Sequence, residues 1–479
     1  MSRINSNVAS LTAQRHLIVS QRALSLSLER LSSGLRINRG ADDPAGLIVS
    51  ERLRAEIAAV DQAIDNSARA INVIATTEGA LNEVAALLSD IQALVIEAAN
   101  SGAFSDDEIA ANQLQMDDAI DSITRIANTT NFAGRKLLNG GLDYITSGIT
   151  RTALADVNVL GAKFGSRTSV PVEVKVTTSA QQGQLTFAMT GVLATAATVD
   201  IAGPDGIITL TFPASATSND IVTAINAQTD STGITASTTG ASSNVVFNTI
   251  EYGSRAFLSI TGLTSDADFP VTRRDGSTVN RTTGRDAVAT INGVSTTADG
   301  LTLTIQQSDL KVQVILSETF GASAIGTSNF EIIGGGALFQ LGPQVNTNLQ
   351  VNIGVSSIQA NKLGNAIVGF LSELKSGQRF SLRNEKFLQA QKVINEVITE
   401  VSVLRGRLGA FERNSLRPNI NQLQITSENL TSAQAVIRDT DFAKETSELT
   451  RAQILVQAGT SILAIANAQS QNVLSLLGG

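Results

Sequence analysis

Both ends of this 479-residue chain carry apolar residues at the spacing of a coiled coil, whereas the middle does not. Near the start, leucines follow one another at steps of seven, four, three and four residues, and they are Leu17, Leu24, Leu28, Leu31 and Leu35. Near the end, the corresponding apolar residues are Ile454, Leu455, Ile462, Leu463, Leu474 and Leu477. A helix with one apolar stripe has to bury that stripe against another surface. We therefore expect the two ends of the chain to pair as helices.

A long helix is expected between the first stripe and the middle of the chain. Asp43 can cap such a helix, and Pro44 fits its first turn, where the missing N–H has no partner to lose. Apolar residues then keep one heptad register from Leu53 to Val95. A helix over residues 44–99 would be roughly 80 Å long, which is typical of a rod and not of a globular helix.

Two further signals mark helix boundaries. Ser105 and Glu108 have the spacing of a capping box, and this interpretation is favoured over a metal site made by the acids at 106–108. Pro418 lies inside an apolar run near the C-terminus and is expected to kink or interrupt that helix.

The middle of the chain, residues 143–360, is rich in Thr, Ser and Gly and alternates like β-strands. Residues 172–176 (VEVKV) alternate strictly between apolar and charged side chains, which predicts a half-buried strand. We expect residues 185–187 to pair with this strand across a turn at Gly183.

Two more elements of the middle region can be read from local signals. Residues 199–212 predict a hairpin around Pro204, Asp205 and Gly206, and residues 219–226 predict a short helix. The fold is therefore expected to be mainly α with a β-rich insert. Discontinuous N- and C-terminal coiled-coil and helical-rod domains pair with each other, and the middle is an α+β excursion.

Composition argues against most chemical functions. The chain has no Cys and a single His, His16, so disulfides, thiolate metal sites and multi-His sites are excluded. The net charge of −8 and the absence of a basic run argue against nucleic-acid binding. We expect no enzyme activity, no catalytic residue, no cofactor and no metal. No cleavable signal sequence is recognisable, and no uninterrupted apolar stretch reaches the ~18 residues that a membrane span needs.

The C-terminal residues 473–477 (VLSLL) end the chain on apolar side chains. Exposed apolar ends are a liability in a soluble monomer. Either they become buried in an assembly, or both ends fold back into one bundle within the molecule. The pattern alone leaves both explanations open.

Several terminal motifs resemble those of bacterial flagellins. In the N-terminal part these are residues 28–38 (LERLSSGLRIN), 42–46 (DDPAG) and 76–83 (TTEGALNE). In the C-terminal part they are residues 429–433 (NLTSA), 438–443 (RDTDFA), 451–455 (RAQIL), 457–461 (QAGTS) and 471–477 (QNVLSLL). Shorter motifs at 217–226 and 286–293 resemble an insert module of flagellins and hook-associated proteins.

The resemblance implies a domain layout and a function. Residues 1–42 and 443–479 would form a terminal coiled-coil domain, the inner filament core. Residues 43–142 and 365–442 would form a helical rod domain, the outer core, and 143–364 would be a variable, surface-exposed insert. The chain would polymerise with itself into the filament used for swimming, with the terminal stripes as the interface.

The resemblance also implies a location and partners. The protein would leave the cell uncleaved through the type III export channel and become part of the extracellular flagellum. An export chaperone would bind its C-terminal segment, and cap and hook-associated proteins would be neighbours in the flagellum. Neither a nucleic acid nor a membrane is expected as a partner.

One stretch departs from the family. Many flagellins are sensed by Toll-like receptor 5 through a rod-helix patch with an arginine in Leu-Gln-Arg-Val-Arg-Glu-Leu. The aligned run here is residues 88–94 (LSDIQAL), so Asp90 replaces that arginine and reverses its charge. We expect receptor signalling to be weak or absent.

Two other functions remain as alternatives to the filament subunit. A hook–filament junction protein shares the terminal helices, although the VLSLL ending favours flagellin. An exported adhesin would use the insert to bind a surface ligand. Filament strand number, handedness and glycosylation cannot be read from the sequence.

Overall fold

The computed structural model describes residues 6–477 except 101, 166, 190, 240–243, 264–268 and 324, and it describes side chains up to residue 469. The expected fold class is confirmed, because long helices at both ends flank a β-rich middle. The chain divides into two compact units, described separately below. The first unit comprises residues 1–68, 341–344 and 417–479, and the second comprises 69–340 and 345–416.

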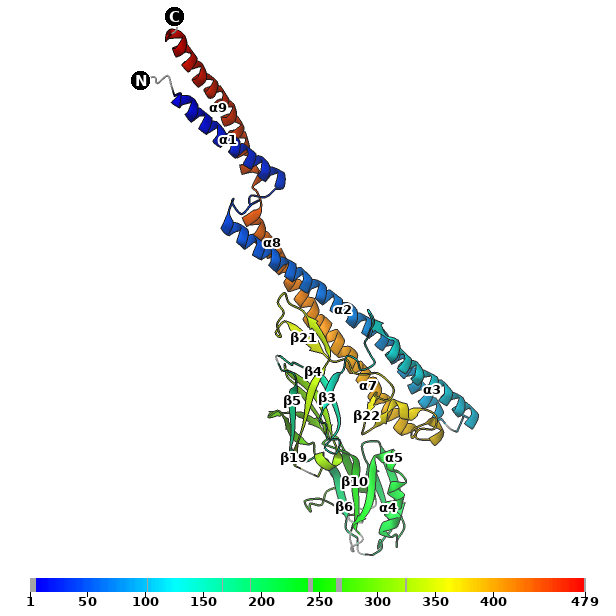
Figure 1. Cartoon of the computed structure of the whole chain (residues 1–479). Helices are drawn as coiled ribbons and strands as arrows, with labels where there is room; N and C mark the ends of the chain where they lie inside the picture. Colours follow the sequence, from blue (N-terminus) through cyan, green and yellow to red (C-terminus); the bar gives the residue numbers. More distant parts are fainter. Residues whose placement is uncertain are drawn as a thin grey trace. The chain divides into compact units, whose positions relative to one another are not determined.

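In the first unit, helices α1 (Val8–Ser33) and α9 (Phe442–Leu477) lie side by side (Figure 1). The Asn7 side chain caps α1 by accepting from the Ser10 N–H. Helix α1 ends at Ser33 because Gly34 adopts a left-handed conformation, with φ of 73°, and donates to the Arg30 carbonyl at 2.8 Å.

Leu35 was expected on the helical stripe, and this placement is wrong. Because the helix ends before Gly34, Leu35 lies in extended backbone and forms an isolated β-bridge with Asp439. The Thr440 N–H donates to the Gly34 carbonyl at 2.9 Å, and the Arg36 N–H donates to the Arg438 carbonyl at 2.7 Å. This bridge ties the end of α1 to the start of α9.

Helix α2 (Pro44–Ala98) is the predicted rod helix, with Asp43 Oδ1 accepting from the Gly46 N–H at 2.9 Å. In the first unit, Val60 and Ala63 of α2 pack against Leu423 of α8 (Arg417–Arg438). In the second unit, every seventh residue of α2 is buried, namely Ile74, Leu81, Leu88 and Val95.

The second unit contains two further long helices. Helix α3 (Asp106–Thr129) begins with the predicted capping box of Ser105 and Glu108. Helix α7 (Phe387–Phe411) buries Ile394, Val397, Val401, Leu404 and Leu408 at steps of three and four. The predicted interruption before Pro418 is confirmed, because a π-helical turn, η3 (Glu412–Leu416), separates α7 from α8. Two 3-10 turns, η1 (Leu371–Leu374) and η2 (Leu382–Asn384), precede α7.

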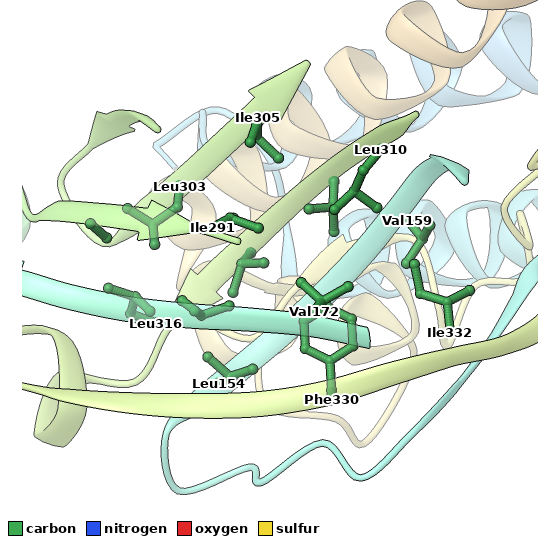
Figure 2. Close-up of a cluster of buried hydrophobic side chains, with 14 of the residues drawn as sticks. Leu154, Val159, Val172, Ile291, Leu303, Ile305, Leu310, Leu316, Phe330 and Ile332 are labelled. Carbon is green, nitrogen blue, oxygen red and sulfur yellow. The ribbon is translucent and has the colours of Figure 1, made fainter. Parts of the chain in front are cut away.

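The β-rich middle has two apolar cores, and two sheets surround the first of them (Figure 2). The five-stranded sheet has the order β15 (Val294–Ser295), β14 (Val288–Ile291), β5 (Val170–Thr178), β19 (Gly326–Gly335), β3 (Tyr144–Ser147). The four-stranded sheet has the order β16 (Thr297–Asp299), β17 (Thr302–Gln306), β18 (Leu310–Leu316), β4 (Leu154–Ala162). The predicted alternation in β5 is confirmed, since Val172, Val174 and Val176 are buried.

Residues of two four-stranded sheets contribute to the second core. One has the order β12 (Val271–Arg273), β6 (Gln182–Phe187), β10 (Asn244–Tyr252), β9 (Ile234–Thr239). The other has the order β13 (Arg281–Thr283), β11 (Phe257–Gly262), β7 (Ala197–Ala202), β8 (Ile207–Phe212). The predicted hairpin is confirmed as β7 and β8, and the predicted short helix is α4 (Ser218–Asn226), which has its own capping box. Stacked Phe187 and Phe269 lie in this core, with ring centroids 3.9 Å apart.

The remaining elements are short. They are β1 (Asn131–Phe132), β2 (Arg135–Lys136), α5 (Thr229–Thr232), α6 (Glu318–Gly321), β20 (Ala337–Gln340), β21 (Gln350–Ile353), β22 (Gly364–Asn365) and β23 (Gly369–Phe370).

The expected pairing of residues 185–187 with 172–176 is wrong. Strand β6 pairs with β10 and β12, whereas β5 pairs with β14 and β19, so the two strands belong to different cores. Gly183 does not form a turn. It lies within β6, and a Cβ there would be 3.2 Å from Thr249 Cγ2 and 3.4 Å from the Ala256 carbonyl oxygen. The glycine is thus explained by close packing.

Candidate self-assembly surface

The contact between α1 and α9 is made mostly by small residues. Ala13 and Leu17 of α1 and Ala452 and Ala466 of α9 are buried. At Gly459 the helices approach so closely that a Cβ would be 3.2 Å from Leu17 Cδ1. Polar contacts near the start of α1 add to the pairing. Asn7 Nδ2 donates to the Ala466 carbonyl at 2.9 Å, and Ser10 Oγ donates to Asn467 Oδ1 at 2.8 Å.

The predicted stripe on α1 divides between this contact and the solvent. Leu17 is buried, Leu24 and Leu31 are half-buried, and Leu28 is 50% exposed. The structure therefore brings Leu17 against α9 and leaves Leu28 facing away from it.

The predicted stripe on α9 is mainly exposed. Ile454 is 59% exposed, Leu455 49% and Ile462 56%, whereas Leu463 is half-buried. The side chains of Leu474 and Leu477 lie outside the described ones.

Other exposed apolar side chains accompany these residues, and they are Val8, Leu11, Ile18, Val19, Phe442 and Ile465. The α1 members were not among the predicted interface residues. Their signal was present in the sequence as a second apolar spacing, three residues from Val8 to Leu11 and seven from Leu11 to Ile18. Helix α1 thus has apolar side chains on more than one face, and only one face contacts α9.

Charged groups fix the end of the helix pair near the β-bridge. Arg30 Nη1 of α1 lies 3.6 Å from Glu445 Oε2 of α9, and the Glu445 residue is buried. Beyond the bridge, Arg438 Nη1 lies 2.7 Å from Glu51 Oε1 of α2, and Arg39 lies 2.9 Å from Glu29. These pairs connect α1, α2, α8 and α9 at the point where both chain segments change direction.

The acidic residues at the start of α3 are used by the helix itself. Glu108 Oε2 accepts from both the N–H and the Oγ–H of Ser105 at 2.8 Å. These hydrogen bonds hold the pKa of Glu108 below its usual value. The capping-box interpretation is therefore confirmed.

In the part of the chain that the structure describes, two helices are long and apolar enough to cross a membrane, α2 and residues Phe442–Gln469 of α9, with mean hydropathies of 1.4 and 1.2. Both helices contain polar and charged residues, so neither is an uninterrupted apolar stretch of ~18 residues. The indication is weak, because helices packed in a protein core pass the same test. In α2 the buried apolar residues recur every seven positions, as in a helix that packs on others.

The fold and this surface define a class: a protein with long terminal helices whose ends present apolar side chains suited to self-association. Comparison with known proteins agrees. Residues 4–142 match the bacterial flagellin N-terminal helical region, residues 391–477 the bacterial flagellin C-terminal helical region, and residues 198–249 the flagellin hook IN motif.

Relatives match along the whole chain. B-type flagellin of Pseudomonas aeruginosa is 30% identical, with 99% of each chain covered. Flagellin of Salmonella typhimurium is 31% identical, again with 99% of each chain covered. Among solved structures, FliC from Burkholderia pseudomallei is 16% identical over 72% of this chain and 99% of that chain, with a TM-score of only 0.24.

The chain therefore belongs to the flagellin family. It is a structural subunit of the bacterial flagellar filament, a surface structure outside the cell, and a hook–filament junction protein is not favoured.

Proposed function

We propose that this chain polymerises through the paired helices α1 and α9 and carries the β-rich insert on the outside of the filament. Residues 1–42 and 443–479 form the inner core in this proposal. Residues 43–142 and 365–442 form the outer core, and residues 143–364 form the exposed insert. The chain acts mechanically and has no catalytic role.

One observation carries the proposal: α1 and α9 remain apolar on their outer faces after they have paired with each other. Leu28, Ile454, Leu455 and Ile462 are each about half exposed or more, at 50%, 59%, 49% and 56%. Burying a whole Leu or Ile side chain contributes about 1.5–3 kcal/mol. Further copies of the same helices would supply the burial that one molecule cannot.

The backbone at the boundaries of the insert supports its assignment as an excursion. The Val355 N–H donates to the Leu142 carbonyl at 2.9 Å, and the Ile358 N–H donates to the Leu138 carbonyl at 3.1 Å. The chain thus leaves and re-enters the helical part of the second unit at adjacent points. Removing what lies between should leave that part intact.

The test is a variant that lacks residues 144–353. Asp143 then joins Gly354 directly, and an Asp-Gly pair is well suited to a two-residue turn between the already hydrogen-bonded Leu142 and Val355. We expect this variant to elongate filament seeds, as measured by sedimentation and negative-stain electron microscopy. Failure to polymerise would favour the adhesin alternative, in which the insert is the functional part.

The deletion also removes residues 341–344, which belong to the first unit. The Leu341 carbonyl accepts from Asn419 Nδ2 at 2.8 Å. Asn419→Ala in the full-length chain is therefore the control, since it removes that hydrogen bond, together with the one to Ser67 Oγ at 3.2 Å, and keeps the insert. Normal elongation by the control would assign any defect of the deletion to the insert itself.

The proposal extends to export and partners. Exposed apolar residues on α9, such as Ile454 and Ile462, need cover before assembly, and we propose that an export chaperone binds this segment. The chain is secreted uncleaved and meets cap and hook-associated proteins in the flagellum. Asp90 is exposed on α2 while Leu88 is fully buried, so the reversed charge would face Toll-like receptor 5.

A further inference from the structure

The second core of the β-rich middle is inserted into the first core in sequence. Its strands, β6 to β13, all lie between β5 and β14, which belong to the first core. The chain therefore passes from the first core to the second at residues 179–181 and returns at residues 284–287. These two connections, and the contacts beside them, determine whether the second core is fixed or free to swing.

The two connections are hydrogen-bonded to each other. The Gln181 N–H donates to the Arg285 carbonyl at 2.8 Å, and the Arg285 N–H donates to the Gln181 carbonyl at 2.9 Å, as an isolated β-bridge. Arg285 Nη2 also donates to the Ser179 carbonyl at 3.0 Å. Ala180 and Ala287, beside the bridge, are buried in the first core. Two paired connections restrict rotation more than one extended linker would.

The turn between β10 and β11 belongs to the second core and packs on these connections. The Gly284 N–H donates to the Ala256 carbonyl at 2.8 Å. Gly253 has a φ of 107°, and a Cβ there would be 2.5 Å from Asp286 Oδ1 and 2.7 Å from Gly300 Cα. Neither the backbone conformation nor the space suits a side chain, so a glycine at this position lets the turn approach the first core.

Asp286 joins that turn to the first core. Its Oδ1 accepts from the Ser254 N–H of the second core at 2.9 Å and from the Gly300 N–H at 2.8 Å. Gly300 lies between β16 and β17 of the first core, and its carbonyl accepts from the Ala287 N–H at 3.0 Å. Hydrogen bonds to an ionised acceptor are roughly twice as strong as those between neutral groups. One half-buried carboxylate thus binds backbone groups of both cores.

Two ion pairs also reach the second core. Arg255 Nη1 lies 2.7 Å from Asp299 Oδ2, and both side chains are largely exposed. Lys392 Nζ of α7 lies 2.8 Å from Asp205 Oδ2 in the turn between β7 and β8. Ion pairs near the surface contribute little to stability, because two long side chains have to be held in one geometry. The backbone contacts of Asp286 are therefore expected to dominate.

We propose that Asp286 is the positioning residue that fixes the second core to the first, so that the two cores move as one body. Without its carboxylate, the second core swings about the bridge between Gln181 and Arg285 while both cores stay folded. The inference goes beyond polymerisation and does not depend on it, because every contact that supports it lies within the second unit.

The test measures the distance between the two cores in the full-length protein by pulsed electron paramagnetic resonance. Because the chain has no cysteine, Thr223→Cys on α4 and Lys175→Cys on β5 place one spin label at an exposed position of each core. We expect a narrow distance distribution in this labelled parent. Asp286→Ala should widen it about twofold or more, because a fixed joint becomes a hinge. Asp286→Asn keeps an oxygen acceptor, so its distribution should stay narrower than that of Asp286→Ala.

Two further variants are the controls. Asp275 Oδ1 accepts from the N–H and the Oγ–H of Ser277, so Asp275→Ala also removes two hydrogen bonds, but both lie within one turn of the second core. Lys392→Gln breaks the ion pair with Asp205 and leaves Asp286 in place. Both variants should keep the width of the parent distribution.

Hydrogen–deuterium exchange of peptides from β5 and β10 reports whether each core stays folded, and Asp286→Ala should keep the protection of the parent. Loss of protection in either core would assign Asp286 to the stability of that core and overturn the proposal. A distance distribution for Asp286→Ala as narrow as that of the parent would also overturn it. So would a broad distribution in the labelled parent, a result that needs no variant at Asp286.

Discussion

A charged replacement at Ile462 is the sharpest test of the self-assembly surface. The Ile462 side chain is 56% exposed after α1 and α9 have paired, so about half of its burial is still to be gained. A whole Ile contributes about 1.5–3 kcal/mol, which leaves about 1 kcal/mol for the polymer contact. Ile462→Asp loses this contribution and adds the cost of desolvating a carboxylate, which is several kcal/mol when no partner is present.

The expected result is a critical concentration raised by about 100-fold or more, since each 1.4 kcal/mol is a factor of ten. The helix content of the monomer should change little, because more than half of the Ile462 side chain is in contact with solvent there. Seeded polymerisation followed by sedimentation measures the critical concentration, and circular dichroism checks that helix content is unchanged.

Two companion variants make the result interpretable. Ile462→Ala removes only apolar area and should raise the critical concentration by about tenfold or less. Gln453→Asp introduces the same charge on the opposite side of α9, at an exposed polar position nine residues away. A critical concentration for Ile462→Asp equal to that of the parent protein would refute the assignment of this face to the polymer interface.

Four further outcomes are expected. Leu31→Asp should abolish filament growth while the insert stays folded, as judged by calorimetry. Phe269→Ala should lower the stability of the second β core by about 3–5 kcal/mol in calorimetry, yet leave filament elongation unchanged. Between pH 4.5 and 7 the parent should lose roughly 3 kcal/mol of stability in thermal melts, because folding raises the pKa of Glu400 to about 7, and Glu400→Gln should not show this loss. In a Toll-like receptor 5 reporter assay the protein should give a weak or absent response, and a response as strong as that of an enterobacterial flagellin would contradict the role of Asp90.

Local signals allowed much of the fold to be predicted. The heptad spacing on α2, the capping box at Ser105 and the interruption before Pro418 each depend on residues within one or two turns. Leu35 shows the limit of the same reasoning. Its spacing fits the stripe, but a left-handed Gly34 ends the helix one residue earlier, and nothing in the spacing distinguishes a terminating glycine from a tolerated one such as Gly79.

Other features depend on contacts that no local pattern contains. The partner of β6 is β10, about 60 residues further along, and not the nearby β5. The raised pKa of Glu400 depends on burial and on the charges of Asp143 and Asp156. These two residues lie at the start of the insert, whereas Glu400 follows its end. The sequence shows Glu400 only as a polar residue on a helix, so its position near Asp143 and Asp156 could not have been predicted.

The helices α1 and α9 carry most of their large apolar side chains on their outer faces, whereas an independent coiled coil carries them in the seam between the helices. In an ordinary pair the large apolar residues fill the seam between the helices. Here the seam contains Ala13, Ala452, Gly459 and Ala466, with Leu17 as its large member, whereas Ile454 and Ile462 face outward. A seam of small residues brings the helices close but contributes little burial, since Ala offers almost no side-chain area. The ordering of both ends costs about 1–2 kcal/mol per residue, so the large outward residues must gain their burial from other copies of the chain.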